Sequence, residues 1–159
     1  MKAIRFSKPG GPEVLALEET ELAPPGPGQV RVRHTVIGVN FIDTYHRSGL
    51  YPVPLPSGLG LEAAGTVDGL GENVRTLKIG DRVAYCSGPL GAYAEANNVP
   101  ADRVVKLSGS VSDEVAAASL LKGMTAQYLL KRTYKLNRGE TILFLAAAGG
   151  VGLIACQWA

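Results

Sequence analysis

The sequence of 159 residues is long enough for one ordinary domain with a hydrophobic core and for the beginning of a second. Hydrophobic residues make up 46% of it, but no apolar run reaches membrane-spanning length and no signal segment opens it, so we expect a soluble chain that is not exported. A net charge of +2 with 6% aromatic residues argues against a nucleic-acid-binding surface.

The part of the chain before residue 108 has the pattern of a β-rich domain. Short apolar or alternating runs, separated by Gly- and Pro-rich turns, predict strands at 2–6, 14–18, 30–38, 63–70, 82–85, 92–97 and 104–107. The segment 47–60 is rich in proline and glycine and has no period, so we expect a surface loop there. Many short strands with such turns favour a compact, partly open β-barrel.

A helical pattern follows the strands. Ser112 has the character of an N-cap, and Asp113 and Glu114 lie in the first turn, where acidic side chains favour the helix dipole. The periodic stretch then runs to Lys131-Arg132. Gly123 interrupts it and marks a point where it can divide into two helices.

The end of the chain predicts a strand, a glycine turn and a helix. The apolar run TILFL at 141–145 is typical of a strand buried on both faces of a parallel sheet, and AAAGGVG and a helix at 153–159 follow it. A glycine turn before a helix N-terminus can hold a pyrophosphate. The alternative is that small residues simply let the helix pack on the strand. Ala146 or Ala147 stands where the first glycine of such a motif makes its tight turn, which weakens the motif.

Seven segments in this order resemble one enzyme family. They are KPGGPEVL, GVNFIDTYHRSGLYP, LPSGLGLEAAG, GDRVAY, GPLGAYAE, LKGMTAQYLL and AAAGGVGLIACQWA. The sequence is similar to zeta-crystallin-type quinone oxidoreductases of the medium-chain dehydrogenase/reductase superfamily. The resemblance implies a mixed α/β fold, in which a GroES-like catalytic domain (1–124) is followed by the start of a Rossmann-type domain (125–159). It also implies NADPH in the cleft between the domains, hydride transfer to a quinone, a cytoplasmic location and a homodimer.

The sequence departs from the zinc enzymes of that superfamily. Asn40 stands where they place a cysteine ligand, and Leu61 stands where they place a histidine. Cys86 and Cys156 are the only cysteines, so the lobe that holds a structural zinc is missing as well. We therefore expect no metal. An electron-poor quinone or enone accepts a hydride without the Lewis acid that alcohol oxidation needs.

The resemblance also assigns site residues. Asn40, Tyr45 and Tyr51 would face the substrate, where an amide or a phenol can hydrogen-bond to the oxygen that gains negative charge. Cofactor contacts are implied at Phe41, Ile42 and Asp43 on the nicotinamide side, at Thr125 and Tyr128 near its ribose, and at Gly149, Gly150 and Val151 for the pyrophosphate.

Plainer interpretations exist for most of these residues. Asn40 and Asp43 can cap or order a turn after a strand. Tyr45 and Tyr51 can be ordinary half-buried aromatics. His34 and His46 have no ligand or nucleophile partner at a recognisable spacing, so a surface role is expected for both.

Other functions also remain open. They are a GroES-like binding module without catalysis, an enone or alkenal reductase of the same superfamily, and RNA binding, a secondary activity of the resembling family. The sequence resembles the first half of an enzyme about twice as long. We therefore expect strand 141–145 to have exposed apolar edges and to promote association.

Overall fold

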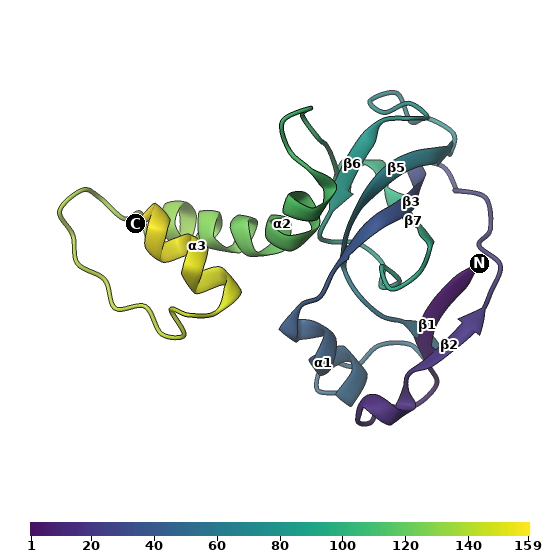
Figure 1. Cartoon of the computed structure of the whole chain (residues 1–159), viewed down its shortest axis with the longest axis horizontal. Coiled ribbons are helices and arrows are strands. Elements are labelled where there is room, and N and C mark those ends of the chain that lie inside the picture. Colours follow the sequence, from purple (N-terminus) through teal and green to yellow (C-terminus); the bar gives the residue numbers. More distant parts are fainter. The chain divides into compact units, whose positions relative to one another are not determined.

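The computed structural model describes residues 1–159, which form two compact units, Met1–Ala118 and Ser119–Ala159. Figure 1 shows that all the strands belong to the first unit, whereas the regular structure of the second unit is helical. None of the helices combines the length and the apolar character that crossing a membrane requires.

The first unit is built on a five-stranded antiparallel sheet in the order β7-β3-β5-β6-β8. Its strands are β3 (Gln29–Gly38), β5 (Glu62–Leu70), β6 (Arg82–Tyr85), β7 (Ala96–Pro100) and β8 (Val104–Lys106). The pairing of β3 with β5 shifts register after Arg31 and after His34. Such irregularities bend a strand and increase its twist, and the sheet curls around its core as a result.

A smaller sheet lies against one end of the curled sheet (Figure 1) and has the order β2-β1-β4. It consists of β1 (Lys2–Phe6), β2 (Ala16–Glu19) and β4 (Ser57–Gly58), and one bridge between Ala3 and Ala94 connects it to the rest. The core of the first unit is apolar and closely packed, with fully buried side chains at Val30, Val32, Val67, Val83, Tyr85 and Val99. The predicted mixed α/β fold with a partly open β-barrel is confirmed.

Two predicted strands lie differently in the structure. At 14–18 a short 3-10 helix, η1 (Pro12–Val14), precedes β2, because Pro12 has the fixed φ that suits a first helical turn. The segment 92–97 does not form one continuous strand, because its backbone hydrogen-bond partners change along its length. The backbone of Tyr93 pairs with Leu59 and Ile4, and the ladder with β3 begins only at Ala96. The other barrel strands lie within one residue of their predicted ends, and a second 3-10 helix, η2 (Ala101–Arg103), precedes β8.

Helix α1 (Phe41–Ser48) was not expected from the sequence. It is eight residues long and follows directly on β3. Gly49 ends it with a φ of 82°, the left-handed conformation that glycine adopts without steric cost. Only residues 49–60 therefore form the loop predicted for 47–60, and this loop includes the short strand β4.

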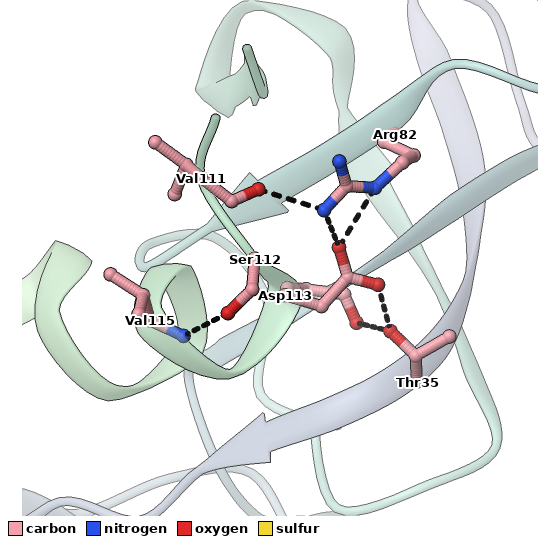
Figure 2. A network of polar contacts seen from close by, with 7 residues as sticks. Thr35, Arg82, Val111, Ser112, Asp113 and Val115 are labelled. Atoms are coloured by element: carbon pink, nitrogen blue, oxygen red, sulfur yellow. Dashed lines mark hydrogen bonds and ion pairs between the residues drawn. The ribbon is translucent and has the colours of Figure 1, made fainter. Parts of the chain in front are cut away.

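Helix α2 (Asp113–Tyr128) begins as predicted. The hydroxyl of Ser112 accepts a hydrogen bond from the backbone N–H of Val115 at 3.2 Å. Figure 2 shows the first residue of the helix, Asp113, held between Arg82 on β6 and Thr35 on β3. Gly123 does not divide the helix, which continues into a π-helical turn, η3 (Leu129–Thr133).

The second unit packs α3 (Gly150–Trp158) on the last turns of α2 and on η3. Ala126, Leu130 and Ala155 are its buried core. The predicted strand at 141–145 is wrong, because the segment has no regular structure, and Leu143 and Leu145 are 89% and 79% exposed. A strand needs a hydrogen-bonded neighbour, and residues 119–159 form no other strand with which this segment could pair.

Candidate functional site

The first candidate region lies at the start of α1, where Asn40 is the N-cap. Its backbone N–H donates to Asp43 Oδ2 at 2.9 Å, and its carbonyl oxygen accepts from the backbone N–H of Asp43 at 3.0 Å. The carboxylate thereby satisfies the N–H of the cap residue, as in a capping box. The plainer interpretation of Asn40 and Asp43, that they order a turn after a strand, therefore describes their local structure.

Glu62 is the residue that sequence reasoning missed here. It is fully buried, and its Oε2 accepts a hydrogen bond from Asn40 Nδ2 at 2.7 Å. The pairing of β3 with β5 places it opposite Gly38. The signal in the sequence was a single acidic residue within the small and apolar run LGLEAAG, since glutamate is rarely buried without a specific partner.

Asp43 forms a second buried polar contact. The hydroxyl of Tyr93 donates to Asp43 Oδ2 at 2.8 Å, and burial together with this carboxylate raises the pKa of Tyr93. The tyrosine therefore stays a donor at physiological pH. The other oxygen, Asp43 Oδ1, is buried and has no hydrogen-bond partner. Sequence reasoning did not single out Tyr93, which lies fifty residues from Asp43 in the chain.

The predicted substrate residues Tyr45 and Tyr51 lie together in an aromatic cluster. Their ring centroids are 5.2 Å apart, and the backbone N–H of Tyr51 donates to the carbonyl of Tyr45 at 3.1 Å. Phe41 packs edge-on against Tyr45 at 5.3 Å and is 74% exposed, while the neighbouring Ile42 is half-buried. No hydrogen bond joins this cluster to Asn40. Phe41 and Tyr51 are exposed, so the cluster presents aromatic side chains to solvent.

His34 does not have the surface role expected for it. Its Nδ1 lies 2.7 Å from the carbonyl oxygen of Ala94, and its Nε2 lies 2.9 Å from the hydroxyl of Tyr85. A carbonyl only accepts, so Nδ1 carries the proton and Nε2 accepts from the tyrosine. Burial lowers the pKa of His34, so the neutral ring is favoured. His46 is half-buried as well, and its Nδ1 is buried without a partner.

The second candidate region is the N-terminus of α3. Gly149 is the N-cap, and no side chain caps this end of the helix. The N–H groups of Gly150, Val151 and Gly152 have no carbonyl partner within the helix, because the first such bond runs from Leu153 to Gly149. Unsatisfied N–H groups and the positive end of the helix dipole suit a phosphate.

The turn before α3 has the backbone of a phosphate-binding loop. Ala146 has a φ of 55°, so it occupies the left-handed position that the first glycine of the motif normally takes. A Cβ on Gly152 would lie 2.5 Å from the carbonyl oxygens of Ala146 and Ala147, so only glycine fits there. The backbone therefore approaches the helix end closely, and these residues fit a dinucleotide pyrophosphate.

Thr125 and Tyr128 lie on the last turns of α2. The hydroxyl of Thr125 donates to the carbonyl of Leu121 at 2.8 Å, so its proton is used within the helix and its lone pairs remain. Tyr128 is 48% exposed. Thr125 can accept a hydrogen bond from a ligand and Tyr128 can accept or donate one, but the structure gives neither a polar partner outside the helix.

The cysteines and the other ligand-forming side chains do not gather. Cys86 is half-buried, and burial together with the charge of Glu62 raises the pKa of its thiol. Cys156 is exposed on α3. No group of three or more His, Cys, Asp or Glu side chains comes together in a way that could hold a metal ion.

Residues 26–109 match the family of the alcohol dehydrogenase GroES-like domain, and they make up more than half of the chain. The chain belongs to this family. The matched domain contains α1, the hydrogen bond between Asn40 and Glu62, and the aromatic cluster. The glycine turn and α3 follow it in sequence.

The individual relatives to which this GroES-like chain is similar include quinone oxidoreductases. A quinone oxidoreductase of Pseudomonas aeruginosa is 59% identical over 159 residues, which cover 99% of this chain and 49% of that protein. The crystal structure of the Escherichia coli quinone oxidoreductase complexed with NADPH is 54% identical, has a TM-score of 0.97, and covers 99% of this chain and 49% of its own. A 2-haloacrylate reductase of a Burkholderia species is 48% identical over 159 residues, 96% of this chain and 47% of that protein.

These comparisons confirm the resemblance inferred from the sequence. The chain spans about half the length of the curated relatives it matches. The NADPH named for the Escherichia coli structure is the cofactor that the resemblance implied.

Proposed function

We propose that the chain takes part in the NADPH-dependent reduction of a quinone by hydride transfer, without zinc. The observation that carries the proposal is the uncapped N-terminus of α3 behind the left-handed turn at Ala146, a phosphate-binding arrangement in a chain 54% identical to a quinone oxidoreductase complexed with NADPH. Gly149, Gly150 and Val151 would bind the pyrophosphate. When bound, NADPH supplies the hydride.

The residues of α1 and its neighbours are proposed to hold the reacting groups. Tyr45 and Tyr51 would donate from their hydroxyls to the quinone oxygen that gains negative charge. The nicotinamide side of the site would be lined by Phe41, Ile42 and Asp43, which follow Asn40 in the chain. The neighbouring ribose would be contacted by Thr125 and Tyr128. None of these groups acts as an essential base in this scheme.

The residue types support a reaction without a metal. Asn40 stands at the place of a cysteine ligand, and its amide is bonded to Glu62. A quinone is already electron-poor, so hydrogen bonds to its oxygens are enough to stabilise the charge that develops. A cytoplasmic location and a homodimer are part of the proposal and are consistent with the two separated cysteines and with the family implied by the sequence.

A second candidate is reduction of an electron-poor carbon–carbon double bond. The Burkholderia relative, at 48% identity, is named a 2-haloacrylate reductase. Haloacrylates and enones accept a hydride at carbon, and the same phenol hydroxyls would then face the conjugated carbonyl or carboxylate group. Side-by-side assays with a simple quinone and an enone would separate the two candidates.

The proposal is tested by titrating the purified chain, its mass confirmed, with NADPH and with NADH while following nucleotide fluorescence. We expect saturable binding that prefers NADPH, followed by quinone-dependent oxidation that a metal chelator does not slow. Tyr45→Phe and Tyr51→Phe should lower turnover and leave NADPH binding unchanged. Absence of binding at millimolar NADPH, or loss of activity with the chelator, would contradict the proposal.

A further inference from the structure

Glu62 has no part in the reaction as proposed so far, although it is fully buried beside the candidate site. Its position is fixed by the sheet. The pairing of β3 with β5 sets it opposite Gly38, and a Cβ on Gly38 would lie 2.5 Å from Glu62 Oε2 and 2.7 Å from its Cγ. The glycine therefore leaves free the volume that the Glu62 side chain fills.

Asn40 is held from its backbone as well as from its side chain. The N–H donates to Asp43 Oδ2 at 2.9 Å, and the carbonyl accepts from the N–H of Asp43 at 3.0 Å. Asp43 is itself held by the hydroxyl of Tyr93 at 2.8 Å. With the backbone fixed, the orientation of the Asn40 amide is the freedom that remains, and its partner at 2.7 Å is Glu62.

The chemistry of the two groups selects one orientation. An ionised carboxylate only accepts hydrogen bonds, whereas a primary amide has a donating N–H₂ edge and an accepting carbonyl edge. Turning the amide over would place Asn40 Oδ1 against the oxygens of Glu62. Asn40 retains 8% of its exposure, and its Nδ2 is bonded to Glu62. Its Oδ1 faces the backbone N–H of Asp43, as in a capping box, and an amide oxygen has a second lone pair. The carbonyl oxygen is therefore the edge left for a ligand.

We propose that Glu62 is a positioning residue, which holds the Asn40 amide with its N–H₂ group inward so that Oδ1 accepts a hydrogen bond from the bound ligand. The ligand's identity rests on the proposed function, in which the group that fits is a donor such as the carboxamide N–H₂ of a nicotinamide. This changes the role expected for Asn40. The donors toward a quinone oxygen are then Tyr45 and Tyr51.

The positioning role is tested without any ligand by NMR of the ¹⁵N-labelled chain. We expect one proton of the Asn40 side-chain amide to be shifted downfield and slow to exchange, because it bonds to a buried carboxylate. Glu62→Gln replaces the charged acceptor by a neutral amide, so it should reduce both the downfield shift and the protection from exchange. Glu18→Gln, which alters an exposed partner of Arg5, should leave both unchanged. An Asn40 amide with the same resonances in Glu62→Gln as in the parent chain would overturn the proposal.

A compensating pair covers the case in which Glu62→Gln fails to fold. Asn40→Asp alone sets two carboxylates against each other in a buried contact, and we expect it to lower the unfolding midpoint in urea. Asn40→Asp combined with Glu62→Gln restores one donor and one acceptor in reversed order, and we expect it to recover most of the loss. A double variant no more stable than Asn40→Asp would contradict the pairing.

The acceptor role is tested by binding. The reduced acetylpyridine analogue of NADPH carries a methyl group in place of the carboxamide N–H₂, and we expect it to bind about tenfold more weakly than NADPH, the effect of one hydrogen bond. Glu62→Gln should narrow that difference. Equal affinities in the parent chain would overturn the acceptor role. Binding of neither dinucleotide would contradict the proposed function and the acceptor role with it, whereas the amide spectra would still decide the positioning role.

Discussion

The guanidinium group of Arg82 donates twice to Asp113 Oδ1, from Nη2 at 2.6 Å and from Nε at 3.1 Å. The hydroxyl of Thr35 donates to the other carboxylate oxygen at 2.6 Å, and this bond, followed by those from Arg82, lowers the pKa of Asp113. The carboxylate thereby ties the first turn of α2 to two strands of the sheet. Its oxygens accept from both strands at once.

Replacing Asp113 by Asn should therefore destabilise the chain. Because Arg82 is 40% exposed and partly screened by solvent, we expect a loss of about 1–2 kcal/mol in the free energy of unfolding, measured by urea denaturation. Asp102→Asn is the matched control. Its carboxylate lies 3.9 Å from Arg103 on the surface, and its removal should change stability by less than about 0.5 kcal/mol. Equal effects of the two substitutions would show that the contacts of Asp113 with Arg82 and Thr35 do not stabilise the chain.

The stability of the folded chain should decrease as the pH is lowered, because of His34. Burial lowers its folded-state pKa below the ordinary value of 6.5, so as the pH drops below 6.5 the unfolded chain takes up a proton that the folded chain resists. The contribution is fully present above that pH and is lost progressively toward the lowered folded pKa. His34→Gln should flatten the dependence of the urea midpoint between pH 7 and the range where carboxylates begin to titrate. A His34 ring resonance that titrates at 6.5 or higher would contradict this account.

Gly150 and Gly152 should respond differently to alanine. A Cβ at Gly152 meets backbone oxygens at 2.5 Å, whereas a Cβ at Gly150 meets only the flexible side chain of Lys122 at 2.8 Å. We expect Gly152→Ala to cost about 1–3 kcal/mol and to weaken NADPH binding, because the turn must move. Gly150→Ala should be close to neutral in stability, since the long side chain can shift. Thermal unfolding followed by circular dichroism makes the comparison, and similar losses for both would be the contrary result.

Ala146→Gly should stabilise the second unit. The left-handed φ of 55° places the alanine Cβ close to the following carbonyl oxygen, which costs about 1–2 kcal/mol for a residue other than glycine. Glycine removes this strain, but its greater conformational freedom in the unfolded chain offsets part of the effect. The expected net gain in the free energy of unfolding is about 0.5–1 kcal/mol. Ala147→Gly provides the matched control and should not stabilise. Slower hydrogen exchange of the α3 amides in Ala146→Gly alone would bear out the expectation.

The barrel strands could be predicted because their signal is local. Alternation along 30–38 and 63–70 reports which face of each strand is buried, and that face stays the same whatever the partner. The segment 141–145 has an equally strong local signal, but a buried parallel strand exists only with neighbours. Here Leu143 and Leu145 face solvent instead. Helix α1 was missed for the opposite reason, because eight residues carry too little periodicity to stand out beside a proline-rich loop.

The candidate site could be predicted only in part. Asn40, Asp43, Tyr45 and Tyr51 were named from the resemblance, and the structure shows the first two joined in a cap and the last two in ring contact. Their partners could not be foreseen. Glu62 reaches Asn40 because of the β3–β5 register, and Tyr93 reaches Asp43 across fifty positions of sequence. Neither arrangement leaves a local pattern.

The placement of the two thiols has a practical consequence for labelling. The raised pKa of Cys86 keeps it protonated at neutral pH, and a protonated thiol reacts poorly with electrophiles. Cys156 is exposed on α3, one turn beyond the glycine-rich start of the helix. A chain with two cysteines should therefore take up a single equivalent of maleimide under mild conditions. A fluorophore attached in this way would report on the end of α3 that is proposed to bind phosphate, without any substitution in the sequence.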